Sequence, residues 1–161
     1  PEGDGPSPDL EEIRGGWHRS QAIKCNNSVW ELIEQAERTP ADDEEMLRRA
    51  YASAYHWQRA KGRGPENEAR AVWMLSKVHL LAGLPERALQ YGDLCLAQCA
   101  GHALADFDLA YALECRARAL RALGREAEAK TAVEDARKAF AADVKAVAEI
   151  DAFAQSAGVA Q

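Results

Sequence analysis

The sequence contains few of the residues that β-strands favour. Val, Ile and Thr together supply 13 of the 161 residues, whereas Ala alone supplies 33. Strands are enriched in β-branched and aromatic residues, and helices in Ala, Leu, Glu, Arg, Lys and Gln. The composition therefore predicts an all-α protein and argues against a doubly wound sheet or a β-sandwich.

Clustered positive charge and long apolar runs are also missing. The chain has 20 Lys and Arg residues against 26 Asp and Glu, for a formal charge of -6. No block of Lys and Arg is long enough to follow a phosphate backbone, so we expect no nucleic-acid partner. No stretch approaches the roughly 20 apolar residues that cross a bilayer. We therefore expect no membrane contact and a cytoplasmic location.

Cysteines are few and have no spacing typical of a disulfide framework. Cys25, Cys95, Cys99 and Cys115 lie in helix-like segments, which favours reduced thiols. Cys95, Cys99 and His102 are spaced to share one helix face, so a structural zinc site or a redox pair is one interpretation. The other is that both cysteines are small buried residues. None of the recognised paired-cysteine zinc spacings is present, and we expect no metal and no cofactor.

Catalytic motifs are absent as well. The sequence has no glycine-rich dinucleotide or phosphate loop, no zinc-protease helix motif and no nucleophile elbow. Its one acidic run, residues 42–45, is explained by the first turn of a helix, where carboxylates favour the positive end of the helix dipole. We therefore expect no enzyme.

Glycine and proline are present where helices should begin and end. Ser7-Pro8-Asp9 predicts a short helix that Gly15-Gly16 ends, inside an N-terminal tail of residues 1–16. A single domain follows at residues 17–161. Its helices are predicted at about 17–38, 40–61, 65–82, 85–99, 104–123, 126–141 and 143–156. A capping-box pattern at residues 28–31 leaves a helix restart there as an alternative. Short turns make consecutive helices antiparallel hairpins.

A repeat emerges when Gly83 is aligned with Gly124. The alignment superposes Val72 on Leu113, Ser76 on Ala117, Ala88 on Ala129 and Cys95 on Ala136. Val72 and Leu113 are the large apolar residues of the pattern, whereas the small residues of the other three pairs let two helices approach closely where they cross. The pattern resembles the tetratricopeptide repeat over residues 66–141. The resemblance implies antiparallel helical hairpins stacked as a right-handed superhelix. It departs from the family in its period, 41 residues instead of about 34, and in Arg116, which replaces an apolar residue.

The resemblance also implies a binding surface on the concave face of the array. In the two repeat units this face would carry Arg70, Trp73, Lys77 and Leu81, then Tyr111, Glu114, Arg118 and Arg121. Trp and Arg dominate binding hot spots, and Arg binds carboxylates through two hydrogen bonds. The expected partner is a protein or peptide with an acidic or C-terminal carboxylate. The alternative is a solvated face with ordinary salt bridges, such as Glu114 with Arg118.

A second candidate site lies between the first two long helices. If the chain folds back near Thr39-Pro40, residues whose numbers sum to about 79 face each other. Asn26 and Asn27 then lie opposite Ser53 and within a turn of His56. One interpretation is a pocket of a ligand-sensing or regulatory domain, and the other is a hydrogen-bond network that sets helix register. A looser resemblance, to bacterial helical proteins with an Asn-Asn pair and a His-Trp pair, implies no activity.

The last helix carries an apolar stripe at helical spacing. Its members are Phe140, Val144, Val147, Ile150 and Phe153. End helices of a repeat array need a polar outer side or a partner. The stripe therefore predicts either a cap that packs on the array or the surface of a homodimer.

Overall fold

The fold consists of helices alone in the part of the chain that the structure describes, which confirms the all-α prediction. This computed structural model describes residues 5, 7–105, 107–140 and 144–156, without the side chains at 8, 144–147 and 154. The helices are α1 Pro8–Ile33, α2 Pro40–Trp57, α3 Pro65–Leu81, α4 Pro85–Gly101, α5 Phe107–Ala122, α6 Glu126–Ala139 and α7 Val144–Ser156. Within these residues no helix is both long and apolar enough to span a membrane.

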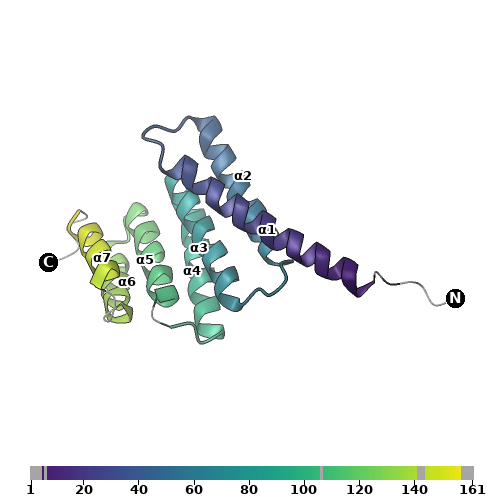
Figure 1. The fold of residues 1–161 in the computed structure, drawn as a ribbon. Helices are drawn as coiled ribbons and strands as arrows, with labels where there is room; N and C mark the ends of the chain where they lie inside the picture. The colour runs from purple at the N-terminus through teal and green to yellow at the C-terminus, as the bar shows by residue number, and fades with distance from the viewer. Residues whose placement is uncertain (1–4, 6, 106, 141–143, 157–161) are drawn as a thin grey trace.

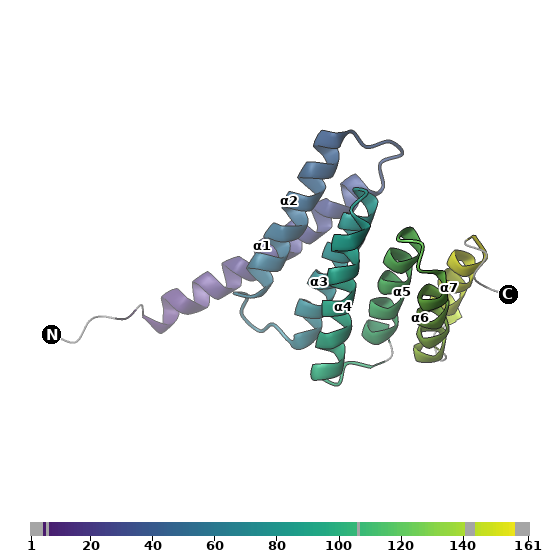
Figure 2. The same ribbon diagram turned by 180° about the vertical axis from the view of Figure 1, so that it is seen from behind.

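The helices stand in a row from the N-terminus to the C-terminus (Figure 1, Figure 2). Each packs against the next helix in the chain, and α3 also packs against α5. The N-terminal half of α1 projects away from the other helices in both views. Because α3 contacts both α4 and α5, the first helices of successive hairpins come together on one side of the row.

Proline marks the start of four helices. It is the first residue of α1, α2, α3 and α4, where its missing N–H costs no hydrogen bond. Thr39 completes the start of α2, because its Oγ1 accepts from the Asp42 N–H at 3.2 Å and its own N–H donates to the Asp42 carboxylate at 2.9 Å. These local signals explain why the predicted helix starts at Pro40, Pro65 and Pro85 are correct.

The predicted helix stop at Gly15-Gly16 is wrong. α1 runs without interruption from Pro8 to Ile33, so residues 8–16 belong to the same helix as residues 17–33. Gly15 instead permits a close approach of the segment after α2: a Cβ there would lie 3.0 Å from the Lys61 Cβ, and its carbonyl accepts from the Lys61 N–H. The helix does not restart at Ser28 either, because the Ser28 hydroxyl donates to the Cys25 carbonyl inside the helix at 2.8 Å.

The two turns that the repeat alignment superposes have the same conformation. Gly83 and Gly124 adopt φ of +78° and +75°, in the left-handed region that glycine tolerates best. The next residue in each turn donates its N–H to the carbonyl five residues earlier, Leu84 to His79 and Arg125 to Leu120, both at 2.9 Å. This is the hydrogen bond of a Schellman-type helix end. The 41-residue period therefore corresponds to a structural repeat of the turn.

The small residues that the alignment assigns to helix crossings are buried. Ala88, Ala117, Ala129 and Ala136 are all buried. Gly92 marks the tightest approach, because a Cβ there would meet the Arg116 Cα of α5 at 3.2 Å. Arg116, the departure from the repeat pattern, pairs with Asp93 at 2.6 Å at the edge of the same crossing.

The apolar stripe of the last helix is covered by the chain itself where the structure describes it. Phe140, Ile150 and Phe153 are buried in one hydrophobic cluster with residues of α4, α5 and α6. The side chains of Val144 and Val147 lie outside the described residues. The buried positions of the three described residues match the cap interpretation of α7.

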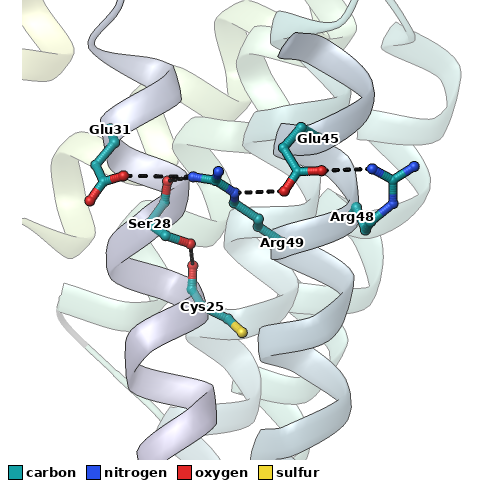
Figure 3. A network of polar contacts seen from close by, with 6 residues as sticks. All are labelled: Cys25, Ser28, Glu31, Glu45, Arg48 and Arg49. Carbon is teal, nitrogen blue, oxygen red and sulfur yellow. Dashed lines mark hydrogen bonds and ion pairs between the residues drawn. The ribbon is translucent and has the colours of Figure 1, made fainter. Parts of the chain in front are cut away.

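The register between α1 and α2 differs by about one turn from the prediction. α1 ends at Ile33, before the predicted end near Arg38, so the fold-back is centred earlier in the chain. Ser53 contacts Ala22, donating to its carbonyl at 2.9 Å. Arg49 lies opposite Ser28, donating to its carbonyl at 2.9 Å (Figure 3).

Arg49 connects the two helices through charged contacts as well. It pairs with Glu45 of its own helix at 2.9 Å and with Glu31 of α1 at 3.6 Å, and Arg48 also binds Glu45 (Figure 3). These contacts hold α1 and α2 in the observed register.

Candidate functional site

A pocket of about 460 Å³ lies among α1, α3 and α5, with α7 at its edge. We call it the Lys77 pocket. Six of the seven predicted partner-binding residues line it, namely Arg70, Trp73, Lys77, Tyr111, Glu114 and Arg118. Its volume falls in the range of about 300 to 1,000 Å³ that is usual for ligand sites. The structure therefore brings together in one pocket six of the residues that the repeat resemblance grouped.

Arg121 is the predicted residue that the structure does not place in this pocket. Its guanidinium lies against the Phe153 ring of α7, 4.4 Å from the ring centre, and its Nη1 is buried. Leu81 lies in a smaller hollow of about 70 Å³ that shares Trp73 and Lys77 with the Lys77 pocket. Arg121 thus contacts the C-terminal helix and lies outside the Lys77 pocket.

Most charges of the pocket are already paired within the chain. Arg70 binds both carboxylate oxygens of Asp108, at 2.8 and 3.3 Å, and this contact raises the pKa of Arg70. Arg118 pairs with Glu114 one turn earlier in α5. Both arginines are therefore held in place before any ligand binds.

Lys77 is different, because its amine has no hydrogen bond or ion pair with any described residue. The nitrogen lies 5.5 Å from the ring centre of Trp73 and 5.7 Å from that of Trp30. Burial lowers the pKa of Lys77, while the nearby Glu114 carboxylate opposes this change. The indole Nε1 of Trp73 is also buried without an acceptor among the described residues. The pocket thus holds one donor, the Lys77 amine, whose hydrogen-bonding capacity no described residue uses.

Sequence reasoning missed the pocket residues that come from α1 and α7. Trp30 and Asn26 of α1 line the pocket, although the sequence assigned Asn26 to a different site. Glu149 of α7 lines it too and accepts from the Tyr111 hydroxyl at 3.3 Å. No spacing within a single helix could identify these residues, because their positions depend on how α1 and α7 pack on the array.

The second predicted site is not assembled. Asn26 lines the Lys77 pocket, Asn27 is exposed, and Ser53 is buried with its hydroxyl donating to the Ala22 carbonyl. His56 contacts His18 instead of the asparagines. The one-turn difference in register explains the error, and the ligand-sensing interpretation loses the pocket on which it rested.

His56 and His18 form an unexpected pair between α2 and α1. Their Nδ1 atoms lie 2.8 Å apart, so one nitrogen donates a hydrogen to the other. Trp17 packs edge-on against both rings. Only one hydrogen fits between the two nitrogens. A second proton on that side would therefore break the contact.

We predict that this pair makes stability decrease as the pH falls. Burial, and secondarily the nearby His18, lowers the pKa of His56. At a pH near the ordinary histidine pKa, the unfolded chain therefore binds more protons than the folded chain does. The unfolding free energy should therefore fall between pH 7.5 and 5.5. His56 should account for less than about 1 kcal/mol of this fall, since the ring is partly exposed.

Urea unfolding at both pH values, in wild type and His56→Gln, measures the effect. The variant should lose part of the pH dependence, and His79, whose pKa burial also lowers, should retain part. His102→Gln is the matched control, because His102 is exposed. An undiminished pH dependence in His56→Gln would contradict the prediction.

The cysteines do not form a ligand cluster with His102. Cys95 and Cys99 are buried, whereas His102 is exposed beyond the end of α4. Burial raises the pKa of the Cys95 and Cys99 thiols, and that of Cys115 to about 12, so all three stay neutral at pH 7. Among the described residues, no three His, Cys, Asp or Glu side chains lie together in a group that could hold a metal ion. These thiols act as small apolar residues.

Comparison with known proteins adds no further identification. No protein-family model matches the chain, and neither a curated protein nor a solved structure is significantly similar to it.

Proposed function

We propose that the chain is a binding scaffold that recognises a protein or peptide segment in the Lys77 pocket. The segment would bring a carboxylate, either an acidic side chain or a C-terminus, to the Lys77 amine. The observation that carries this proposal is the partly buried amine of Lys77, which lies between Trp30 and Trp73 in the pocket and has no ion pair with any described residue. The ammonium group of Lys77 forms its strongest hydrogen bonds with an ionised acceptor, because charge-assisted hydrogen bonds are stronger than those between neutral groups.

We also propose that the hairpins stack as a right-handed array like that of tetratricopeptide repeats. The identical turns at Gly83 and Gly124 and the buried alanines at the crossings support this arrangement. So does the placement of pocket residues on α1, α3 and α5, the first helices of successive hairpins. In such an array these helices line the concave side.

The proposed role is binding without chemistry, in the cytoplasm and away from nucleic acid. The acidic groups Asp108 and Glu114 in the pocket are engaged by arginines, which leaves neither as a general base. The free thiols suit a reducing compartment. The net negative charge disfavours a nucleic-acid partner.

Calorimetric titration of synthetic peptides tests the proposal. An array of pentapeptides with free C-terminal carboxylates supplies the probes, and the best binder is remade with a C-terminal amide. If the carboxylate binds Lys77, Lys77→Met should weaken binding about tenfold, the scale of one charge-assisted hydrogen bond. Methionine keeps the apolar stem against Trp30 and Trp73, so this variant removes mainly the charge.

Lys24→Met is the matched control, because Lys24 is exposed on α1 outside the pocket. It should bind as the wild type does. Binding that is unchanged by Lys77→Met, or equal for amide and carboxylate peptides, would overturn the proposal. Circular dichroism of each variant establishes that it remains folded.

A further inference from the structure

The charges that line the Lys77 pocket are balanced. Its cations are Arg70, Lys77 and Arg118, and its carboxylates are Asp108, Glu114 and Glu149. Four of these six charges form two ion pairs, because Arg70 binds Asp108 and Arg118 binds Glu114. The groups outside these pairs are one cation, Lys77, and one carboxylate, Glu149.

The two remaining charges occupy different depths of the same pocket. Lys77 lies partly buried between Trp30 and Trp73, whereas Glu149 is exposed at the rim, on α7. The Glu149 carboxylate contributes to the electrostatic environment of Lys77, although the two form no ion pair. Among the described residues, one contact to Glu149 is short enough to be a hydrogen bond, the long one of 3.3 Å from Tyr111. Its carboxylate therefore retains capacity for a further donor.

α7 holds Glu149 in a defined place at the rim. Ile150 and Phe153 are buried on the array, and Arg118 and Arg121 lie over the Phe153 ring at 4.3 and 4.4 Å. Asp151 adds an ion pair with Arg137 of α6 at 2.7 Å. Three successive contacts thus fix the turn of α7 that carries Glu149.

We infer that the segment bound in this pocket carries one carboxylate and one basic side chain, rather than a run of acidic residues. The carboxylate binds the buried Lys77 amine, and the lysine or arginine of the ligand binds Glu149 at the rim. Only the first carboxylate of a polyacidic segment could bind Lys77, because the other two cations of the lining are already in ion pairs. A second carboxylate would bring another negative charge near Glu149. This inference rests on the proposed function, because it defines the ligand of the same site.

Peptide specificity provides the test. Pentapeptides with a free C-terminal carboxylate carry Lys, Gln or Glu at each upstream position in turn, and their affinities are measured by calorimetry. Wild type should prefer Lys over Gln by about tenfold at one position, the scale of one added charge-assisted contact. It should bind the Glu peptide most weakly of the three.

A double-mutant cycle assigns the preference to Glu149. In Glu149→Gln the preference for Lys over Gln should disappear, while the preference for carboxylate over amide remains. In Lys77→Met the preference for carboxylate over amide should disappear, while the preference for Lys over Gln remains. Glu134→Gln is the matched control, because Glu134 is exposed on α6 away from the pocket, and it should retain both preferences.

The outcomes separate this inference from the proposed function. If wild type requires the carboxylate but prefers polyacidic peptides, or if Glu149→Gln retains the lysine preference, the inference is overturned and the proposed function stands. If wild type does not distinguish carboxylate from amide, both fail.

Discussion

Gly92→Leu is expected to lower the free energy of unfolding by about 3 kcal/mol. A Cβ at this position would lie 3.2 Å from the Arg116 Cα and 3.4 Å from its backbone nitrogen. The obstructing atoms belong to the backbone of α5, which cannot rotate aside as a side chain can. Forcing bulk into a packed crossing costs about 1 to 3 kcal/mol, and contact with backbone places this change at the upper end.

Urea unfolding followed by circular dichroism measures the loss. Gly16→Leu is the matched control, because Gly16 lies inside α1 and a Cβ there would meet no atom within 4 Å. Leucine favours helix over glycine, so the control should be unchanged or slightly more stable. Wild-type stability in Gly92→Leu would show that α4 and α5 do not cross as closely as the structure has them.

Leu120→Ala is the second substitution with a large expected effect. Leu120 is completely buried in the cluster that joins α5, α6 and α7, together with Val133, Phe140 and Ile150. Truncating a buried leucine removes its transfer free energy and leaves a cavity, at a cost of about 3 kcal/mol. For a chain of this length the melting temperature should fall by roughly 6 to 12 °C.

Leu94→Ala provides the comparison for this prediction. Leu94 is on α4 and 45% exposed, so its truncation should cost well under 1 kcal/mol by the ordinary scale for surface changes. Both substitutions raise helix propensity equally. A cost for Leu120→Ala as small as that for Leu94→Ala would contradict the packing of the C-terminal helices.

The sequence contains most of the information about where helices begin and end. Proline at a helix start and glycine in a left-handed turn act within a few residues, so Pro40, Pro65, Gly83 and Gly124 identify their turns without any tertiary structure. Gly15 fails as a signal for the same reason. Its role is to admit Lys61 from a distant segment, and a local pattern cannot distinguish that role from a helix stop.

Only the part of the candidate site that lies on single helices could be predicted from the sequence. Residues on one face of one helix are related by fixed spacing, so Arg70, Trp73 and Lys77 could be grouped from the sequence. The neighbours from α1 and α7 could not, because a shift of one turn between helices changes which side chains meet. The same shift explains why Asn27 and His56 were grouped wrongly and why the contact of His56 with His18 was missed.

The unbroken helix α1 joins the pocket to the first turns of the same helix, at Leu10 and Ile13. With 26 residues at about 1.5 Å each, α1 is a rod of about 39 Å. One part of it, at Asn26 and Trp30, forms a wall of the pocket, and the other end carries the exposed side chains of Leu10 and Ile13. Between these two parts, the Gly15 carbonyl accepts a hydrogen bond from the Lys61 N–H. One continuous helix therefore carries both a wall of the pocket and, about 30 Å from Trp30 along its axis, the exposed apolar side chain of Leu10.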